Sequence, residues 1–160
     1  MWDLLTWIDG TSLAETIRIS LWIFPALEIG HVAAIAVVLG SIARVDLRLA
    51  GLASRDRSIT EFSHEMLPWT WVAFAVATVF GILLFVGQPL RYVEIALFDA
   101  KIILILLAGL NMLVFEHLTR RSVGRWDGEP IPPVQVRIAG GLSLAFWISV
   151  VVCGRFIGFV

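Results

Sequence analysis

The stretch LWIFPALEIGHVAAIAVVLGSI, residues 21–42, decides the fold. It is apolar for long enough to cross the hydrocarbon core of a bilayer, which takes about 20 helical residues. Glu28 and His31 nevertheless lie inside it, one helical turn apart. An ionisable group at the centre of a membrane helix costs free energy, roughly 2.5–3.5 kcal/mol for lysine or aspartate. The stretch therefore predicts a membrane helix in which these two side chains have a function.

The rest of the chain has the same character. Of its 160 residues, 59% are hydrophobic and 16% are charged, which is more apolar and less charged than an ordinary soluble domain. The four segments long enough to span are about 17–42, 69–86, 93–115 and 136–156. They lack the alternation of barrel strands, and backbone groups in lipid must be satisfied internally, so we expect helices. The sequence predicts an all-α bundle of four transmembrane helices, forming one domain over residues 1–160.

Local signals add detail to this expectation. Residues Met1–Ile8 include two tryptophans among apolar side chains and predict a short interfacial helix. Ser12 and Glu15 have the spacing of a capping box that would open a long first helix. Pro25 is expected to kink the first span, and Pro68 suits the first turn of the second.

The distribution of arginine predicts the orientation. Eight arginines lie in or beside the first and third connections: Arg44, Arg48, Arg55, Arg57, Arg120, Arg121, Arg125 and Arg137. The other side has Arg18, Arg91 and Arg155. Because Lys and Arg mark cytoplasmic loops, both termini should face away from the cytoplasm, which for a bacterial inner membrane means the periplasm. The net charge of −1 and the lack of a basic run argue against a nucleic-acid partner.

His31 is the first candidate functional residue. It lies about 18 Å along the helix from the expected outer end near Ile19, which is close to mid-membrane. A neutral imidazole there could be an axial ligand to haem iron, or it could be a buried histidine bonded to Glu28 or to a neighbouring helix. Lys101 is expected at the depth of Glu28 and could pair with it. Alternatively, Lys101 and Arg155 could neutralise haem propionates.

The other two histidines, His64 and His117, are expected at the cytoplasmic boundary. They could form a second ligand pair, or they could be solvated side chains. His117 could be the second axial ligand beside His31 only if the third span is shifted or kinked. Glu-x-x-His occurs at both Glu28 and Glu61, but helical rise separates the two histidines by about 15 Å, so a di-iron carboxylate site is rejected.

Two runs carry a resemblance to a known family. Residues 27–35 with 44–48, and residues 98–107, resemble small four-helix bacterial membrane proteins of the copper resistance D-like group. The closer match is to an uncharacterised branch, through residues 67–71, 110–112 and 154–155. The layout is also similar to the four-helix haem-pathway protoporphyrinogen oxidase, which binds b-type haem. In that family a first-helix histidine and a third-helix lysine are functional, which implies His31 and Lys101.

There is one departure from the oxidase pattern. That family has a further histidine low in its third helix, where this chain has Asn111 and Met112. The leading interpretation is thus a b-type haem protein that handles electrons, with a quinol or a partner subunit as reductant. A porphyrinogen oxidase, a copper permease, and a haem-free accessory subunit or small transporter are the alternatives. Small residues such as Gly154 and Gly158 leave a homo-oligomer open.

Overall fold

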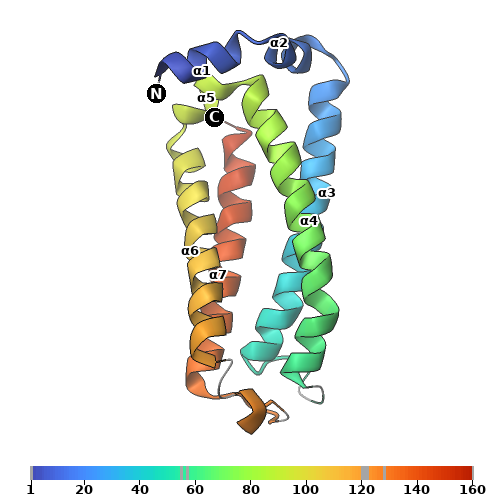
Figure 1. Ribbon diagram of the computed structural model, residues 1–160, viewed down its shortest axis with the longest axis vertical. Coiled ribbons are helices and arrows are strands. Elements are labelled where there is room, and N and C mark those ends of the chain that lie inside the picture. Colours follow the sequence, from blue (N-terminus) through green and yellow to red (C-terminus); the bar gives the residue numbers. More distant parts are fainter. Residues whose placement is uncertain (1, 55, 57, 120–122, 128, 160) are drawn as a thin grey trace.

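The computed structural model describes residues 2–54, 56, 58–119, 123–127 and 129–159, and within them it contains helices and no strands (Figure 1). Four of the helices are long and apolar enough to cross a membrane: α3 (Ile23–Leu49), α4 (Ile59–Gly87), α6 (Ala96–Thr119) and α7 (Val134–Ile157). The expected all-α bundle of four candidate transmembrane helices is therefore confirmed.

Three short helices cover one end of this bundle, which we call the amino-terminal end. They are α1 (Trp2–Asp9), α2 (Ser12–Ile19) and α5 (Pro89–Val93), and the carboxyl end of α7 lies beside them (Figure 1). The predicted short N-terminal helix is thus present, and its Trp2 and Trp7 are exposed.

Arg18 of α2 joins α1 to the end of α4. Its guanidinium donates to the Asp9 carbonyl at 3.0 Å and pairs with the Asp9 carboxylate at 2.9 Å. Its Nε donates at 3.2 Å to the carbonyl of Gly87, the last residue of α4. One side chain therefore satisfies a terminal carbonyl of α4 and holds the end of α1 against it.

The first span begins later than the sequence predicts. The chain forms a separate helix, α2, and leaves it at Ser20, whose hydroxyl accepts from the amide of Ile23 at 3.2 Å. The cap of α2 is Thr11, whose hydroxyl accepts from Ala14, so the expected capping box at Ser12 was misplaced by one residue. Pro25 falls in the first turn of α3, where its missing N–H is not needed, so it does not interrupt the span.

The second span begins earlier than predicted. Helix α4 starts at Ile59, with the Ser58 hydroxyl accepting from the amide of Glu61 at 3.1 Å. Pro68 is therefore inside the helix and not in its first turn. The chain tolerates it because a proline removes a single i→i−4 bond from a helix of 29 residues.

The four long helices pack as two pairs. Helix α3 lies along α4 and α6 along α7, and the pairs are joined chiefly where α3 meets α7. Among the described residues, the backbones of α4 and α6 rarely come close to each other, although Phe85 of α4 stacks on Phe98 of α6 with ring centroids 5.6 Å apart. At the α3–α7 crossing, Gly140 lies so close to the backbone of Asp46 that a Cβ there would be 2.8 Å from its carbonyl oxygen.

The two longer connections lie at the other end, which we call the arginine-rich end (Figure 1). Of the arginines predicted there, the structure describes Arg44, Arg48, Arg125 and Arg137, while residues 55, 57, 120 and 121 lie outside the described part. The Arg48 side chain is fully buried and donates to the Glu129 carbonyl at 3.1 Å. This bond ties the connection before α7 to the end of α3.

Candidate functional site

His31 lies on the face of α3 that packs against α4. Its Nδ1 is 2.7 Å from the carbonyl oxygen of Ala77, and because a carbonyl only accepts, Nδ1 is the protonated nitrogen. In a neutral imidazole this leaves Nε2 with its lone pair. Room for the ring comes from Gly81, where a Cβ would be 3.0 Å from the imidazole Cε1.

Lys101 lies in the second turn of α6 and is half-buried against α7. A Cβ built at Gly154 would be 3.5 Å from the Lys101 Nζ, so this glycine leaves space for the lysine side chain. The charge of Lys101 acts electrostatically on His31. The structure thus places the two residues on facing helix pairs, within electrostatic reach of each other.

The other predicted site residues lie elsewhere. Glu28 is exposed, and within the described residues no ion pair joins it to Lys101. Its charge instead acts on Tyr92 of α5: burial raises the pKa of Tyr92, Arg91 lowers it and Glu28 raises it. Glu28 and Lys101 were predicted to lie at the same depth and to pair, but they do not form an ion pair in the described structure.

Arg155 and His117 are also separate from His31. The Arg155 guanidinium lies 4.6 Å from the ring centroid of Phe159, at the amino-terminal end of the bundle. His117 is exposed in the last turn of α6, and 16 residues of one continuous helix, about 24 Å of rise, separate it from Lys101. Helix α6 is not broken between them, so no kink brings His117 toward His31.

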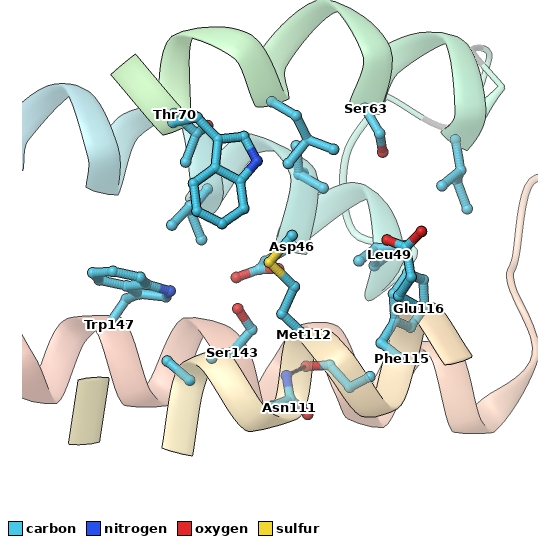
Figure 2. Close-up of a pocket in the computed structure, with 18 of the residues that line it drawn as sticks. Asp46, Leu49, Ser63, Thr70, Asn111, Met112, Phe115, Glu116, Ser143 and Trp147 are labelled. Carbon is cyan, nitrogen blue, oxygen red and sulfur yellow. Dashed lines mark hydrogen bonds between the residues drawn. The ribbon is translucent and has the colours of Figure 1, made fainter. Parts of the chain in front are cut away.

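The structure also contains a cavity that the sequence did not predict. Its volume is about 620 Å³, and it lies between the two helix pairs toward the arginine-rich end, with walls from α3, α4, α6 and α7 (Figure 2). Its lining is mainly apolar and aromatic, including Leu67, Phe74, Met112, Phe115 and Trp147. His31 and Lys101 do not line it.

Asp46 is the ionisable residue in the wall of this cavity that is most deeply buried. It is 5% exposed, and a side-chain hydrogen bond joins it to Ser143 of α7. Its Oδ2 is buried and has no hydrogen-bond partner in the described structure. Figure 2 shows the Asp46 carboxylate facing the Ser143 hydroxyl, with Trp147 forming part of one wall.

A sequence signal for Asp46 existed. Arg44 and Arg48 flank it at two residues on either side, which on a helix places them on other faces. The positions three and four residues away, which do share its face, are Ile42, Ala43, Leu49 and Ala50, and all are apolar. An aspartate without a basic i±3 or i±4 partner at the end of a membrane helix is therefore a candidate for a buried carboxylate.

The described residues contain no group of three or more His, Cys, Asp or Glu side chains arranged to hold a metal ion. A haem iron needs fewer protein ligands than such a site, because the porphyrin supplies four nitrogens. His31 is the histidine of the described structure whose geometry is suited to that role, with one ring nitrogen bonded to backbone and the other carrying a lone pair.

Fold and site together define a multi-pass helical membrane protein with ionisable side chains between its helices. The chain belongs to DUF6644, a family of unknown function whose sequence profile matches residues 23–160. The match begins at the first residue of α3, so α1 and α2 lie outside it. No curated protein and no solved structure matches the chain.

Proposed function

We propose that this protein binds a b-type haem on His31 and transfers electrons in the bacterial inner membrane. The single observation that carries the proposal is the 2.7 Å hydrogen bond from His31 Nδ1 to the Ala77 carbonyl. Metal-ligating histidines donate their other ring N–H to a carbonyl or carboxylate, which fixes the tautomer and the orientation of the ring. The bond therefore prepares Nε2 to act as a ligand.

Lys101 supports the same proposal from the facing helix pair. Its charge interacts electrostatically with His31, and its Nζ lies beside Gly154, which has no side chain to fill that space. A half-buried ammonium in a membrane bundle needs a counter-charge, and a haem propionate is one. Haem, when bound, supplies one-electron chemistry, while the protein sets the potential through the axial ligand, the nearby charge and burial.

The remaining predicted residues have smaller roles in this proposal. Arg155 at the amino-terminal end is a second propionate partner, and exposed Glu28 adds negative charge one turn before His31. His117 has no role as a ligand, because it lies too far along α6. The proposal therefore assigns one axial ligand, His31, to the chain.

The proposed orientation of the protein in the membrane rests on the distribution of its arginines. With the arginine-rich end in the cytoplasm, both termini and α5 face the periplasm, and His31 is nearer the periplasmic side. A quinol in the bilayer or a partner subunit is the source of electrons in this proposal.

The visible spectrum of the purified protein tests the proposal. Expression with adequate haem supply should give a Soret band, and reduction with dithionite should sharpen the bands at longer wavelength. His31→Ala should remove them while circular dichroism stays helical, and His64→Ala, an exposed histidine, should leave them unchanged. A folded but colourless wild-type protein would overturn the haem assignment in favour of a haem-free accessory subunit or transporter. Oxidation of a porphyrinogen by the purified protein would instead favour the enzyme.

A further inference from the structure

We propose that the cavity between the two helix pairs binds a lipophilic organic cation, with the Asp46 carboxylate as its counter-charge. The proposal rests on the cavity and not on haem, because His31 does not line the cavity. Each part of the cavity wall supports one property of this ligand.

The first property is positive charge. A buried carboxylate oxygen without a hydrogen-bond partner is costly in a low-dielectric site, and the Oδ2 of Asp46 is such an atom. Glu116 is a second acid in the wall, and among the described lining residues there is no lysine or arginine. Within the described part of the wall, the one basic side chain is His64, which is exposed. A cation is therefore attracted to this cavity and an anion is repelled.

The second property is an apolar, partly aromatic body. Trp71, Phe74 and Trp147 form a connected group in the wall, with ring centroids 6.3 Å apart for the first pair and 6.1 Å for the second. Aromatic faces attract organic cations as well as apolar groups. An acid beside aromatic walls is thus suited to an ammonium group on a hydrophobic body.

The other polar groups near Asp46 already have partners inside the protein. The Thr70 hydroxyl donates to Ser41 at 2.8 Å, and the Asn111 amide donates to the Ala139 carbonyl at 3.0 Å. Asp46 is therefore the polar group whose hydrogen-bonding capacity is left for a ligand.

The size and the access route fit a ligand that arrives through the bilayer. A volume of about 620 Å³ lies within the usual range for small-molecule sites, roughly 300–1,000 Å³. Helices α4 and α6 both line the cavity, their backbones rarely come close, and the stacked Phe85 and Phe98 rings that join them are not part of the cavity wall. In this proposal the ligand enters from the lipid between these two helices.

Three ligands that share a phenylhexyl group and differ in their polar group test the proposal: phenylhexylammonium, phenylhexanol and phenylhexanoate. Titration calorimetry on the full chain in nanodiscs, with empty nanodiscs subtracted, measures binding of each. We expect the ammonium to bind, and the alcohol and the carboxylate to bind at least about tenfold more weakly, since a charged hydrogen bond is worth about 1.5–3 kcal/mol. Equal binding of the alcohol, preferred binding of a short-chain quinol, or no binding of the ammonium would overturn the proposal.

Two pairs of variants tie the binding to this cavity. Asp46→Asn should weaken ammonium binding about tenfold or more, and Asp99→Asn, at an exposed acid of α6, should not. If Asp46→Asn does not fold, Gly109→Leu fills the cavity instead, because a Cβ there meets no atom within 4 Å and Gly109 lines the wall. Gly40→Leu, at an exposed glycine of α3 that also has no atom within 4 Å, is its control. Ammonium binding that survives Gly109→Leu unchanged would overturn the proposal.

The outcome is distinguishable from that of the haem proposal. Asp46→Asn should keep any Soret band, since Asp46 is not near His31 along α3. His31→Ala should keep ammonium binding. Loss of both properties in either variant would mean that the two sites are one, which contradicts this inference.

Discussion

Gly140 of α7 and Asp46 of α3 are in backbone contact: a Cβ at Gly140 would lie 2.8 Å from the Asp46 carbonyl oxygen and 2.8 Å from the Leu49 Cβ. This contact is part of the α3–α7 packing, which is the main junction between the two helix pairs, and it involves the segment that carries the cavity carboxylate. The position of Asp46 thus depends on a missing side chain on the neighbouring helix.

Gly140→Ala should therefore destabilise the bundle. The added methyl meets backbone, which cannot move aside as a flexible side chain can, so we expect a loss of about 1–3 kcal/mol. Thermal unfolding in detergent measures the loss. Gly141→Ala is the matched control, because this exposed neighbour has no atom within 4 Å of its Cβ position and should change stability little. Equal effects of the two substitutions would show that close approach at Gly140 is not the reason.

Gly81→Ala should disturb His31 more than it disturbs the fold. A Cβ would lie 3.0 Å from the imidazole Cε1 and 3.4 Å from Nδ1, so the ring must tilt and its bond to Ala77 must lengthen. If haem is bound through His31, its absorption bands should shift or weaken while the helix content stays the same. Gly40→Ala is the control on α3. Unchanged spectra in a haem-containing Gly81→Ala protein would argue that His31 is not the ligand.

Lys101→Met should lower the midpoint potential of a bound haem. The reduced haem carries one positive charge less than the oxidised form, so a nearby ammonium favours reduction, and its removal favours the oxidised state. Lys101→Arg, which keeps the charge, should keep most of the potential. Spectroelectrochemical titration in nanodiscs measures both. An unchanged potential for Lys101→Met would place the lysine away from the haem.

Arg18→Ala should loosen the amino-terminal end without unfolding the four long helices. It removes bonds to Asp9 and to the Gly87 carbonyl, which together are worth about 1–3 kcal/mol. Hydrogen exchange should increase in α1 and α2 and remain slow in α3 and α7. Glu15→Ala, at an exposed side chain of α2, should leave the exchange of α1 unchanged. Faster exchange spread over the whole chain would contradict a local role for Arg18.

Hydropathy predicted the four long helices because long apolar runs allow few structures in lipid. The helix ends were harder, because they depend on single hydroxyls. The bond from the amide of Ile23 to Ser20 separates α2 from α3, and the Ser58 cap starts α4 well before its apolar part. Both bonds involve local geometry that an apolar pattern does not contain.

The candidate site was partly predictable. Helical rise placed His31 near mid-membrane and Lys101 at the depth of Glu28, one turn from His31, and the structure puts His31 and Lys101 within electrostatic reach. Depth says nothing about which way a side chain faces, so the expected pairing of Glu28 with Lys101 did not follow. The lack of a basic residue on the Asp46 face of its helix was a local signal, but its contacts with Ser143 and Gly140, which are distant in sequence, could not be predicted.

The scarcity of backbone contacts between α4 and α6 affects how the concentration of a cavity ligand should be expressed. When the ligand resides almost wholly in the bilayer and enters the cavity from the acyl chains, the practical measure of its concentration is its mole fraction among the phospholipids. Diluting a sample with more vesicles would then empty the protein even at constant total amount, whereas adding water would not. A ligand too hydrophilic to partition into the bilayer would not reach the cavity by this route, even if its charged group suited Asp46.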